Sequence, residues 1–533
     1  MTHEDVDFQA KSSGWVASKK PCCIGSYVEP PNPTLRKSRS RAETERSVML
    51  ACGLNSLGVG RSDRVAVIHP NCHRFLELYF AAAKIGAVLV PVNCRLAPAD
   101  FVSILNDSQS KLLVAHPEFL SSVLQNKESL PFLEKVISNG SGSRVGWNED
   151  LMEYEQLMAD ADLAKEPESP GVNPSDAAQI YYTSGTTGRP KGVVLTHRNN
   201  EVHAEGTIAE FGLTSRDRWL HVSPMFHLAD AWAVWAITRV AGMHVMIPRF
   251  EPHQVLRAIE RHRVTLSNFI PTMLNVLVHV PDIRRYDLSS LRLVLSGGAP
   301  IAREVVRKVV EVFGCDYIQT YGLTETSPFL TMSILKNELR RLPFEERLKY
   351  MATTGRPFCK VELKVVKEDG SPVLSDEKDV GEIIVRGETV TPGYWRRPEE
   401  TSARIVDNWL HTRDLAVVNP EGYITIVDRK DDVIITGGEK VYSIEVEDVL
   451  YSHPSILEAA VIGLPDPVWG EKVTAVVVLK EKENVGEEEI IRFCKQRLAH
   501  FKAPKKVIFT DHLPKTGSAK ISKYRLRQML RPE

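Results

Sequence analysis

An alternation of short apolar runs with amphipathic stretches between residues 63 and 138 constrains the fold of this 533-residue chain more than any other feature. The runs at 64–70, 87–93 and 111–117 are rich in Val, Leu and Ile, whereas residues 72–86 have apolar side chains at helical spacing. Strands that alternate with helices form βαβ units, which place the strands side by side in a parallel sheet. We therefore predict the α/β class with parallel sheets.

Short apolar runs typical of buried strands occur again at 264–271, 291–300 and 315–322, and each ends in a turn rich in Gly or Pro. In open α/β sheets, ligands bind beyond the carboxyl ends of the strands. These turns are therefore the first place in which we expect a site.

The chain changes character after about residue 355. Hairpin-like segments appear, such as 415–429 with a turn at Asn419–Gly422, and they predict a small β subdomain. Beyond Asp428 comes an α+β stretch of a normal size for a small domain. We predict an N-terminal domain at 1–427 (sheets at 45–355, β subdomain at 356–427) and a C-terminal α+β domain at 428–533.

The charge of the chain is balanced, with 67 Lys and Arg against 68 Asp and Glu, which gives no support to a nucleic-acid partner. The eight cysteines are scattered without CxxC spacing, and the polar N-terminus does not read as a secretory signal. The most apolar windows, at 76–92 and 228–248, contain charged residues, so we expect no transmembrane segment. A cytoplasmic protein is the expectation.

One ten-residue run, TSGTTGRPKG at 183–192, has the composition of a polyphosphate cradle. Glycines let the backbone turn its N–H groups toward an anion, hydroxyls add donors, and a lysine adds charge. Because Gly192 follows the lysine where Ser or Thr is needed, the run is not the common P-loop, and a kinase or P-loop ATPase is disfavoured. The residues expected at the phosphates of ATP are Thr183, Ser184, Gly185, Thr186, Thr187, Gly188 and Lys191.

Four further motifs follow in order: PMFH at 224–227, SGGAP at 296–300, YGLTET at 321–326 and PKTGSAK at 514–520. With the run at 183–192, they make the chain resemble the adenylate-forming (AMP-binding) superfamily of acyl-CoA synthetases, luciferases and nonribosomal-peptide adenylation domains. The resemblance extends from about residue 48 to 528 and is strongest to the acyl-CoA synthetase, or fatty-acid–CoA ligase, branch.

That resemblance implies a two-step reaction that uses ATP, Mg²⁺ and CoA. A carboxylate attacks the α-phosphorus of ATP to give an acyl-adenylate and pyrophosphate, and a thiol then attacks the adenylate. Because two anions must meet, positioning and charge stabilisation should dominate catalysis. The resemblance assigns Mg²⁺ to Glu325 and Thr183, the adenine to Tyr321 and the turn at Gly298, and the ribose to Asp414. The full nucleotide set that it implies adds Ala299, Pro300, Gly322, Thr324 and Arg429.

The resemblance also implies a moving C-terminal domain. Lys520 matches the lysine that bridges carboxylate and α-phosphate, and Asp428 matches the hinge. After rotation about that hinge, Gly437, Gly438 and Lys440 would bind CoA, because a side chain at the glycines would obstruct the thin pantetheine arm. His227 matches the gate between the acyl pocket and the thiol tunnel.

The chain departs from the family pattern in four places. Arg413 and Ala519 stand where glycine is usual, and Lys440 replaces a commoner asparagine. An arginine at position 413 must point away from ATP or make a new phosphate or domain contact. The usual N-terminal strand before residue 45 is not recognisable.

The acyl pocket is expected to be apolar. Amino-acid-activating relatives carry Phe-Asp where this chain has Phe226 and His227, so the partner of a substrate ammonium is missing, although Asp230 lies close by. An apolar pocket favours a fatty acid of medium to long chain, with an aromatic or alicyclic acid as the alternative. The candidate pocket residues are Trp232, Trp235, Phe269, Met273, Leu323 and Phe329.

Only 13 residues follow Lys520, so we expect no fused carrier domain and free CoA as the acceptor. The alternatives are delivery to a separate carrier protein and a non-catalytic nucleotide-binding relative, which the substitutions at Arg413 and Ala519 raise. Glu325 and Lys520 favour an enzyme. The expected partners are a small carboxylic acid, ATP and CoA, and the oligomeric state, a homodimer included, is left open.

Overall fold

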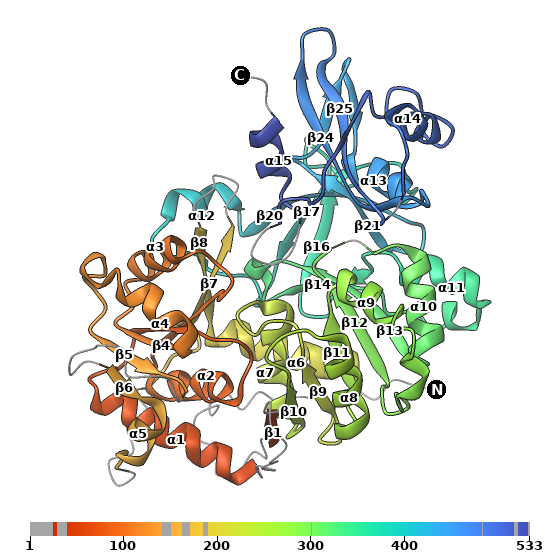
Figure 1. Ribbon diagram of the computed structural model, residues 1–533. Helices are drawn as coiled ribbons and strands as arrows, with labels where there is room; N and C mark the ends of the chain where they lie inside the picture. The colour runs from red at the N-terminus through yellow and green to blue at the C-terminus, as the bar shows by residue number, and fades with distance from the viewer. Residues whose placement is uncertain are drawn as a thin grey trace.

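The computed structural model describes residues 25–28, 40–140, 151–162, 171–184, 190–299, 301–481, 483–515 and 521–530. These residues form four β-sheets, here sheets A to D, with helices packed on their faces. Figure 1 shows the smaller C-terminal part, with β24 (Ile456–Asp466) and β25 (Gly470–Leu479), standing above the rest of the molecule. None of the helices in these ranges is both long and apolar enough to cross a membrane.

Sheet B contains the alternation predicted for residues 63–138. Its central strands pair in parallel, and helix α2 (His73–Ile85) begins after Cys72 and ends at Gly86, whose φ of +68° suits glycine. The predicted α/β class is confirmed. The strand order is β18 (Gly393–Tyr394), β8 (Pro190–Thr196), β7 (Ala177–Ser184), β3 (Val88–Val92), β2 (Arg64–Ile68), β4 (Leu112–Ala115), β5 (Lys135–Ser138), β6 (Leu151–Glu153).

Sheet A is parallel except at β14 and β15. It also contains β1, in the region where the sequence showed no recognisable strand, because four residues at a sheet edge are too few to give a periodic pattern. The strand order is β1 (Gly25–Val28), β10 (Met243–Met246), β9 (Arg218–His221), β11 (Leu266–Phe269), β12 (Leu293–Gly297), β13 (Asp316–Gly322), β14 (Phe329–Met332), β15 (Arg356–Pro357).

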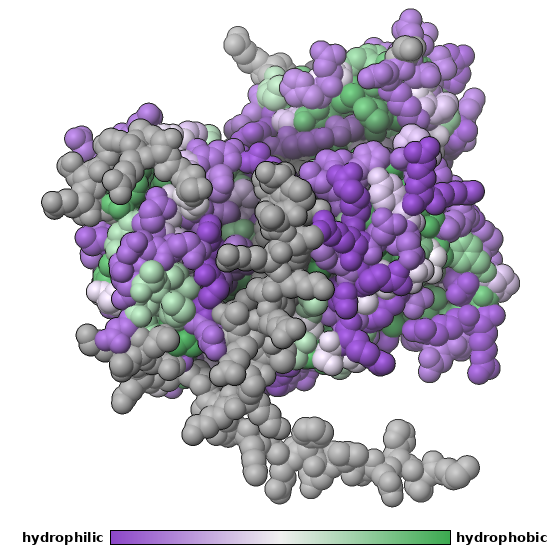
Figure 2. All heavy atoms as spheres, turned by 60° about the horizontal axis from the view of Figure 1, so that its bottom comes forward, coloured by the Kyte–Doolittle hydropathy of each residue, from purple (hydrophilic) through white to green (hydrophobic). Residues whose placement is uncertain are grey.

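The largest apolar core lies between sheets A and B. Helices α2, α6 (His197–Phe211) and α7 (Leu228–Arg239) contribute to it, together with strands of both sheets. Among the coloured residues in Figure 2, polar ones predominate, and the apolar areas are separate from one another. The remaining helices are α1 (Ser40–Ser56), α3 (Pro98–Ser108), α4 (Pro117–Leu124), α5 (Tyr154–Ala159), α8 (Pro252–His262), α9 (Pro271–Leu277), α10 (Arg303–Phe313), α11 (Phe344–Met351) and α12 (Pro398–Arg404).

Sheet C is the β subdomain expected after residue 355. Its strands are antiparallel, and the predicted turn at Asn419–Gly422 joins β20 to β21, with Gly422 at φ +80°. The strand order is β16 (Glu362–Val366), β17 (Gly381–Arg386), β20 (Trp409–Val418) and β19 (Ile405–Val406), with β21 (Ile424–Arg429) paired to β20.

Sheet D and three helices form the C-terminal part, with their own apolar cores. The predicted boundary between residues 427 and 428 falls inside β21 and stays a prediction. The strand order of sheet D is β23 (Glu439–Val441), β22 (Ile434–Thr436), β25 and β24, with β26 (Lys506–Phe509) paired to β25. The helices are α13 (Ser443–Tyr451), α14 (Glu487–Lys495) and α15 (Lys523–Leu530).

Candidate active site

The run at 183–192 forms a hairpin between β7 and β8. Thr183 pairs with Lys191 across it, and the tip lies outside the described residues. The Lys191 ammonium forms an ion pair with Glu400 and lies 5.8 Å from the centroid of the Tyr394 ring. A cation is therefore held at the base of the hairpin, where a polyphosphate would need it. The predicted residues Gly185, Thr186, Thr187 and Gly188, and the side chain of Ser184, lie outside the described residues.

Glu325 lies in a short 3-10 helix, η4 (Thr324–Thr326), and its side chain is buried. Its Oε1 accepts a hydrogen bond from the Tyr394 hydroxyl at 2.8 Å. Burial and the charge of Glu325 together raise the pKa of Tyr394, so the phenol stays a donor. The carboxylate keeps further lone pairs for a hard cation, which fits the expected Mg²⁺ ligand.

Asp414 joins two of the other predicted ATP residues. Its carboxylate accepts a hydrogen bond from the Tyr321 hydroxyl at 2.6 Å and pairs with the Arg429 guanidinium at 3.1 Å. The negative charge of Asp414 raises the pKa of Arg429. Asp414 is buried, and a carboxylate has about four acceptor positions, so about two remain for ribose hydroxyls.

The turn after β12, which is the predicted adenine wall, leaves little room for side chains. Gly298 has φ +87°, and a β-carbon on Gly297 would come within 2.5 Å of the Thr320 hydroxyl, so neither position tolerates a side chain. Gln319 Nε2 donates to the carbonyl of Ala299 at 3.1 Å and so ties the turn to β13. Pro300 lies outside the described residues.

His227 is the N-cap of α7, directly after the PMFH motif. Asn71, after β2, fixes that motif: its Oδ1 accepts from Met225 N at 2.8 Å and its Nδ2 donates to Ser223 O at 2.9 Å. The predicted gate is thus set at the junction of sheets A and B. Asn71 was missed because only the fold brings it there.

Asp230 is fully buried and satisfied inside the core. Its Oδ2 lies 2.5 Å from His221 Nδ1, and its Oδ1 accepts from Trp219 Nε1 at 3.3 Å. Both oxygens therefore have partners, and this carboxylate does not stand free for a substrate ammonium.

The six predicted pocket residues do not lie together. Trp232 and Phe329 are in contact, with ring centroids 5.2 Å apart. Trp235 instead packs on Phe80 of α2, at 5.3 Å. Phe269 and Met273 belong to a separate core beneath α8 to α10, and Leu323 lies half-buried beside Glu325. Assignment of these residues to the acyl pocket stays a prediction.

The hinge candidate Asp428 is buried and reaches into the C-terminal part. Its carboxylate accepts hydrogen bonds from the backbone N–H and, at 2.8 Å, from the hydroxyl of Ser443, at the start of α13. Lys523 donates to the same hydroxyl at 2.5 Å. Burial raises the pKa of Asp428, and Lys523 and Ser443 oppose that rise.

The structure shows how an arginine is accommodated at position 413. Its φ is +64°, the left-handed region where glycine is favoured, and its side chain turns to Asp431, with Nε 3.0 Å from Oδ2. Its carbonyl accepts from Lys430 N at 2.8 Å, and the Lys430 ammonium pairs with Glu382 at 3.3 Å. With the Arg429–Asp414 pair, three consecutive residues after the hinge candidate Asp428 form ion pairs with side chains on β17 and β20. We call these three pairs the hinge clasp.

The predicted CoA glycines lie at the turn between β22 and β23. Gly437 and Gly438 have φ of +58° and +83°. A β-carbon on Gly437 would come within 3.0 Å of the Trp469 ring, whereas space at Gly438 is open. Trp469 and Val468 beside this turn are exposed apolar side chains, 50% and 76% exposed. The motifs did not point to them, but an apolar pair in a turn is a sequence signal that could have identified them. Lys440 forms an exposed ion pair with Glu368.

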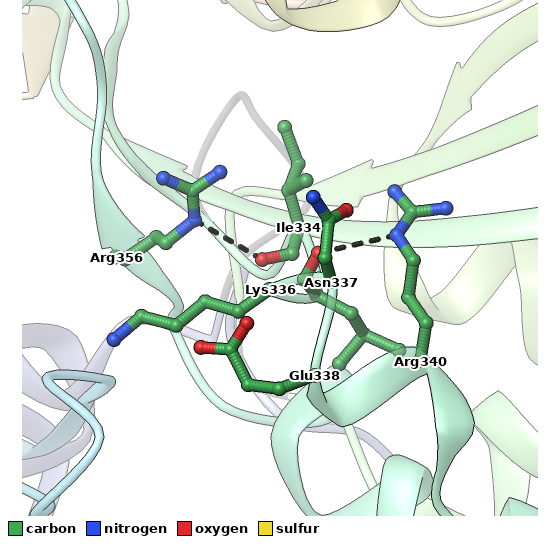
Figure 3. A pocket seen from close by; sticks show the side chains of 7 residues that line it. Ile334, Lys336, Asn337, Glu338, Arg340 and Arg356 are labelled. Carbon is green, nitrogen blue, oxygen red and sulfur yellow. Dashed lines mark hydrogen bonds between the residues drawn. The ribbon is translucent and has the colours of Figure 1, made fainter. Parts of the chain in front are cut away.

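Lys520 and Ala519 lie outside the described residues. A surface cavity of about 390 Å³ lies apart from every predicted site residue (Figure 3). Two arginines on its walls are bound to the loop itself, since Arg356 Nε donates to Ile334 O at 3.2 Å and Arg340 Nε to Leu335 O at 3.3 Å. This cavity is therefore not part of the candidate active site.

The chain is similar to known proteins along most of its length. Residues 41–395 match the family described as AMP-binding enzyme, and residues 445–520 match the AMP-binding enzyme C-terminal domain. The chain is 37% identical over 484 residues to 4-hydroxybutyrate–CoA ligase 2 of Metallosphaera sedula, covering 90% of this chain and 87% of that protein. It is 38% identical to feruloyl-CoA synthase of an Amycolatopsis species, over 91% of this chain and 93% of that one. ATP-bound MatB from Rhodopseudomonas palustris has a similar structure, with a TM-score of 0.83 at 28% identity over 97% of each chain.

Proposed function

Since the chain belongs to the AMP-binding enzyme family and is an AMP-forming carboxylate–CoA ligase that uses ATP, Mg²⁺ and CoA, we propose that its substrate is a compact carboxylic acid with a largely apolar skeleton. The single observation that carries the substrate proposal is the contact of Trp232 with Phe329. In this proposal, those two rings close the acyl pocket beyond His227, so we expect a short or aryl acid rather than the medium to long chain expected from the sequence.

The reaction balances without a further reactant. A carboxylate oxygen bonds to the α-phosphorus of ATP, and pyrophosphate leaves. The CoA sulfur then bonds to the acyl carbon, AMP leaves, and the thiol proton passes to solvent. In this proposal, the free acceptor positions of Asp414 would hold the ribose, Glu325 would hold Mg²⁺ when it is bound, and Lys191 would neutralise phosphate charge.

For the second step, we assign the CoA arm to the face made by Gly437, Gly438 and Trp469. The open space at Gly438 and the exposed indole give a bare backbone and an apolar wall, which suit a thin pantetheine chain. In this proposal, rotation about Asp428 alternates that face with Lys520.

The test is a panel of carboxylic acids from C2 to C18, with aryl acids included, assayed with ATP and Mg²⁺ with and without CoA. We expect AMP and thioester with short or aryl acids, and no thioester without CoA. Best activity with C14 to C18 acids would overturn the substrate size. AMP release without thioester, restored by a carrier protein, would overturn the use of free CoA.

A pair of variants on one helix tests the pocket wall. Trp232→Ala should move the preferred acid to larger ones, since it opens space beside Phe329, and discrimination of about 1–3 kcal/mol per methylene is the scale of the effect. Trp235→Ala opens space against α2 instead and should leave the profile in place. If both variants shift the preferred acid size equally, Trp232 and Trp235 line the same pocket and the distinction made here is wrong.

A further inference from the structure

Six aromatic side chains form a closed group, which we call the aromatic enclosure: His203, Phe211, Trp219, Trp232, Phe329 and Phe358. The centroid of the His203 ring lies 5.1 Å from that of Phe329, 5.5 Å from that of Phe358 and 6.0 Å from that of Trp232. His203 and Trp232 are 2% and 1% exposed. The enclosure is therefore sealed from solvent in this structure.

Two polar atoms in the enclosure have no hydrogen-bond partner among the described residues. They are Nε2 of His203 and Nε1 of Trp232. The third polar ring, Trp219, differs, because its Nε1 donates to Asp230. Buried polar atoms without partners are rare in folded proteins, and each one calls for an explanation such as an absent ligand.

The chemistry of the two atoms is complementary. An indole N–H only donates, and it needs an acceptor. Burial lowers the pKa of His203 to about 3, so the ring is neutral and one of its nitrogens is able to accept. A hydroxyl group within hydrogen-bond reach of both atoms would satisfy both at once, since its oxygen would accept from Trp232 and its proton would be donated to His203. A bare methyl group satisfies neither.

The enclosure lies at a suitable depth. Trp232 is five residues beyond the His227 gate on α7, which is about 7.5 Å along the helix axis. Phe329 pairs with Gly322 of the YGLTET motif, so one wall of the enclosure adjoins the nucleotide residues. An acid whose carboxylate is held at ATP would thus extend its far end toward His203 and Trp232.

We propose that the acid activated by this enzyme carries a hydroxyl group at the end of its skeleton opposite the carboxylate, and that Trp232 Nε1 and His203 recognise that hydroxyl. The inference rests on the proposed function, because it needs the acid to occupy the space next to Trp232. His203 then becomes a specificity-determining residue that no motif marks.

Matched acids test the proposal: butanoate against 4-hydroxybutanoate, hexanoate against 6-hydroxyhexanoate, and cinnamate against 4-hydroxycinnamate. We expect kcat/KM for thioester formation to favour the hydroxy acid of the best pair by at least about 100-fold, because its deoxy analogue leaves two buried polar atoms unpaired. His203→Phe and Trp232→Phe, which keep an aromatic ring, should each reduce that preference by at least about 10-fold. Trp409→Phe, which deletes an indole N–H on β20 outside the enclosure, should keep it.

The outcomes separate this inference from the function beneath it. If no acid yields AMP, the substrate proposal as a whole fails. If deoxy acids react as well as hydroxy acids, the enzyme stands but a buried water fills the role of the hydroxyl, and the inference is overturned. If the two variants slow both members of a pair equally while circular dichroism shows a folded protein, the rings only pack, and recognition by His203 and Trp232 is refuted.

Discussion

Replacing Arg413 by glycine changes two opposing terms at one position. With φ at +64°, the β-carbon of Arg413 is crowded by its own backbone, which costs about 1–2 kcal/mol. Glycine removes that strain, but it makes the unfolded chain more flexible, which costs about 0.4–1 kcal/mol. From the backbone alone, we expect Arg413→Gly to gain roughly 1 kcal/mol in the free energy of unfolding.

The charge term has the other sign. The guanidinium contacts both carboxylate oxygens of Asp431, but the two side chains are 45% and 42% exposed, so solvent screens the pair and its value is about 0.2–1 kcal/mol. Arg413→Gly should therefore stay within about 1 kcal/mol of wild type. Arg413→Ala keeps the strain and loses the pair, so it should be the least stable of the three proteins.

Urea unfolding of the three proteins, together with Asp431→Asn and the double variant Arg413→Ala/Asp431→Asn, measures both terms. The difference between the Gly and Ala variants reports the backbone, and the Arg413–Asp431 double-mutant cycle reports the pair. A Gly variant less stable than the Ala variant would refute the strain argument. A coupling energy above about 2 kcal/mol would refute the screened pair.

The same substitution tests the hinge clasp in function. Rotation about Asp428 would have to separate Arg413 from Asp431, so the pair favours the domain orientation of this structure. Arg413→Gly and Asp431→Asn should therefore speed whichever half-reaction waits for rotation. Wild type at about 0.5 M salt should approach the variants, since exposed pairs are screened there. If neither salt nor the substitutions change the rates of the two half-reactions, the hinge clasp has no role in the mechanism.

Three further outcomes are expected. Lys520→Ala should slow adenylate formation while sparing thioester formation from supplied acyl-adenylate, and Gly438→Trp should do the reverse; equal damage to both half-reactions in folded variants contradicts domain alternation. Glu325→Gln should slow ATP–pyrophosphate exchange at least about 100-fold, and an unchanged rate would exclude a role for its charge. Burial lowers the pKa of His203 to about 3 in the folded protein, against 6.5 in the unfolded chain, so the free energy of unfolding falls as the pH drops below about 6.5. Between pH 7 and pH 5, the free energy of unfolding of His203→Phe, measured with urea, should fall by about 2 kcal/mol less than that of wild type. Equal decreases in the two proteins would show that the His203 ring is not held neutral by burial.

The sheets could be read from the sequence where a local period exists. Residues 63–138 show alternating strand and helix patterns, and the structure has them as β2, α2, β3, α3, β4, α4 and β5. The turn at Asn419–Gly422 could be predicted because its Asn, Pro and Gly residues are typical of turns. Strand β1 could not be read, because its place depends on pairing with β10, which lies more than 200 residues later.

The site divides in the same way. Tyr321, Asp414 and Arg429 were placed together by register with the motifs, and they share one carboxylate in the structure. Trp232 and Trp235 looked equivalent, three residues apart on one helix. Their neighbours differ, since one packs on β14 and the other on α2, and helical spacing alone carries no information on which element covers which face.

Position 413 shows where a sequence rule and a structure meet. The rule was that glycine is usual there; the structure gives the reason, a left-handed backbone, and also the compensation, an ion pair to Asp431. Only the strain is fixed by the fold. The direction of the arginine side chain depends on the position of the hinge segment, which no local pattern predicts.

Two buried indoles in the aromatic enclosure separate packing from recognition. Trp219 and Trp232 lie 4.8 Å apart, and both are almost completely buried. The core provides Trp219 with a carboxylate from Asp230, so this chain is able to satisfy an indole N–H where packing alone is at stake. An unpaired N–H beside it costs about 1–3 kcal/mol, and His203 adds a second such group. A ligand hydroxyl recovers both costs on binding, and a deoxy acid recovers neither. The unpaired atoms thus favour the hydroxy acid in binding before any chemical step begins.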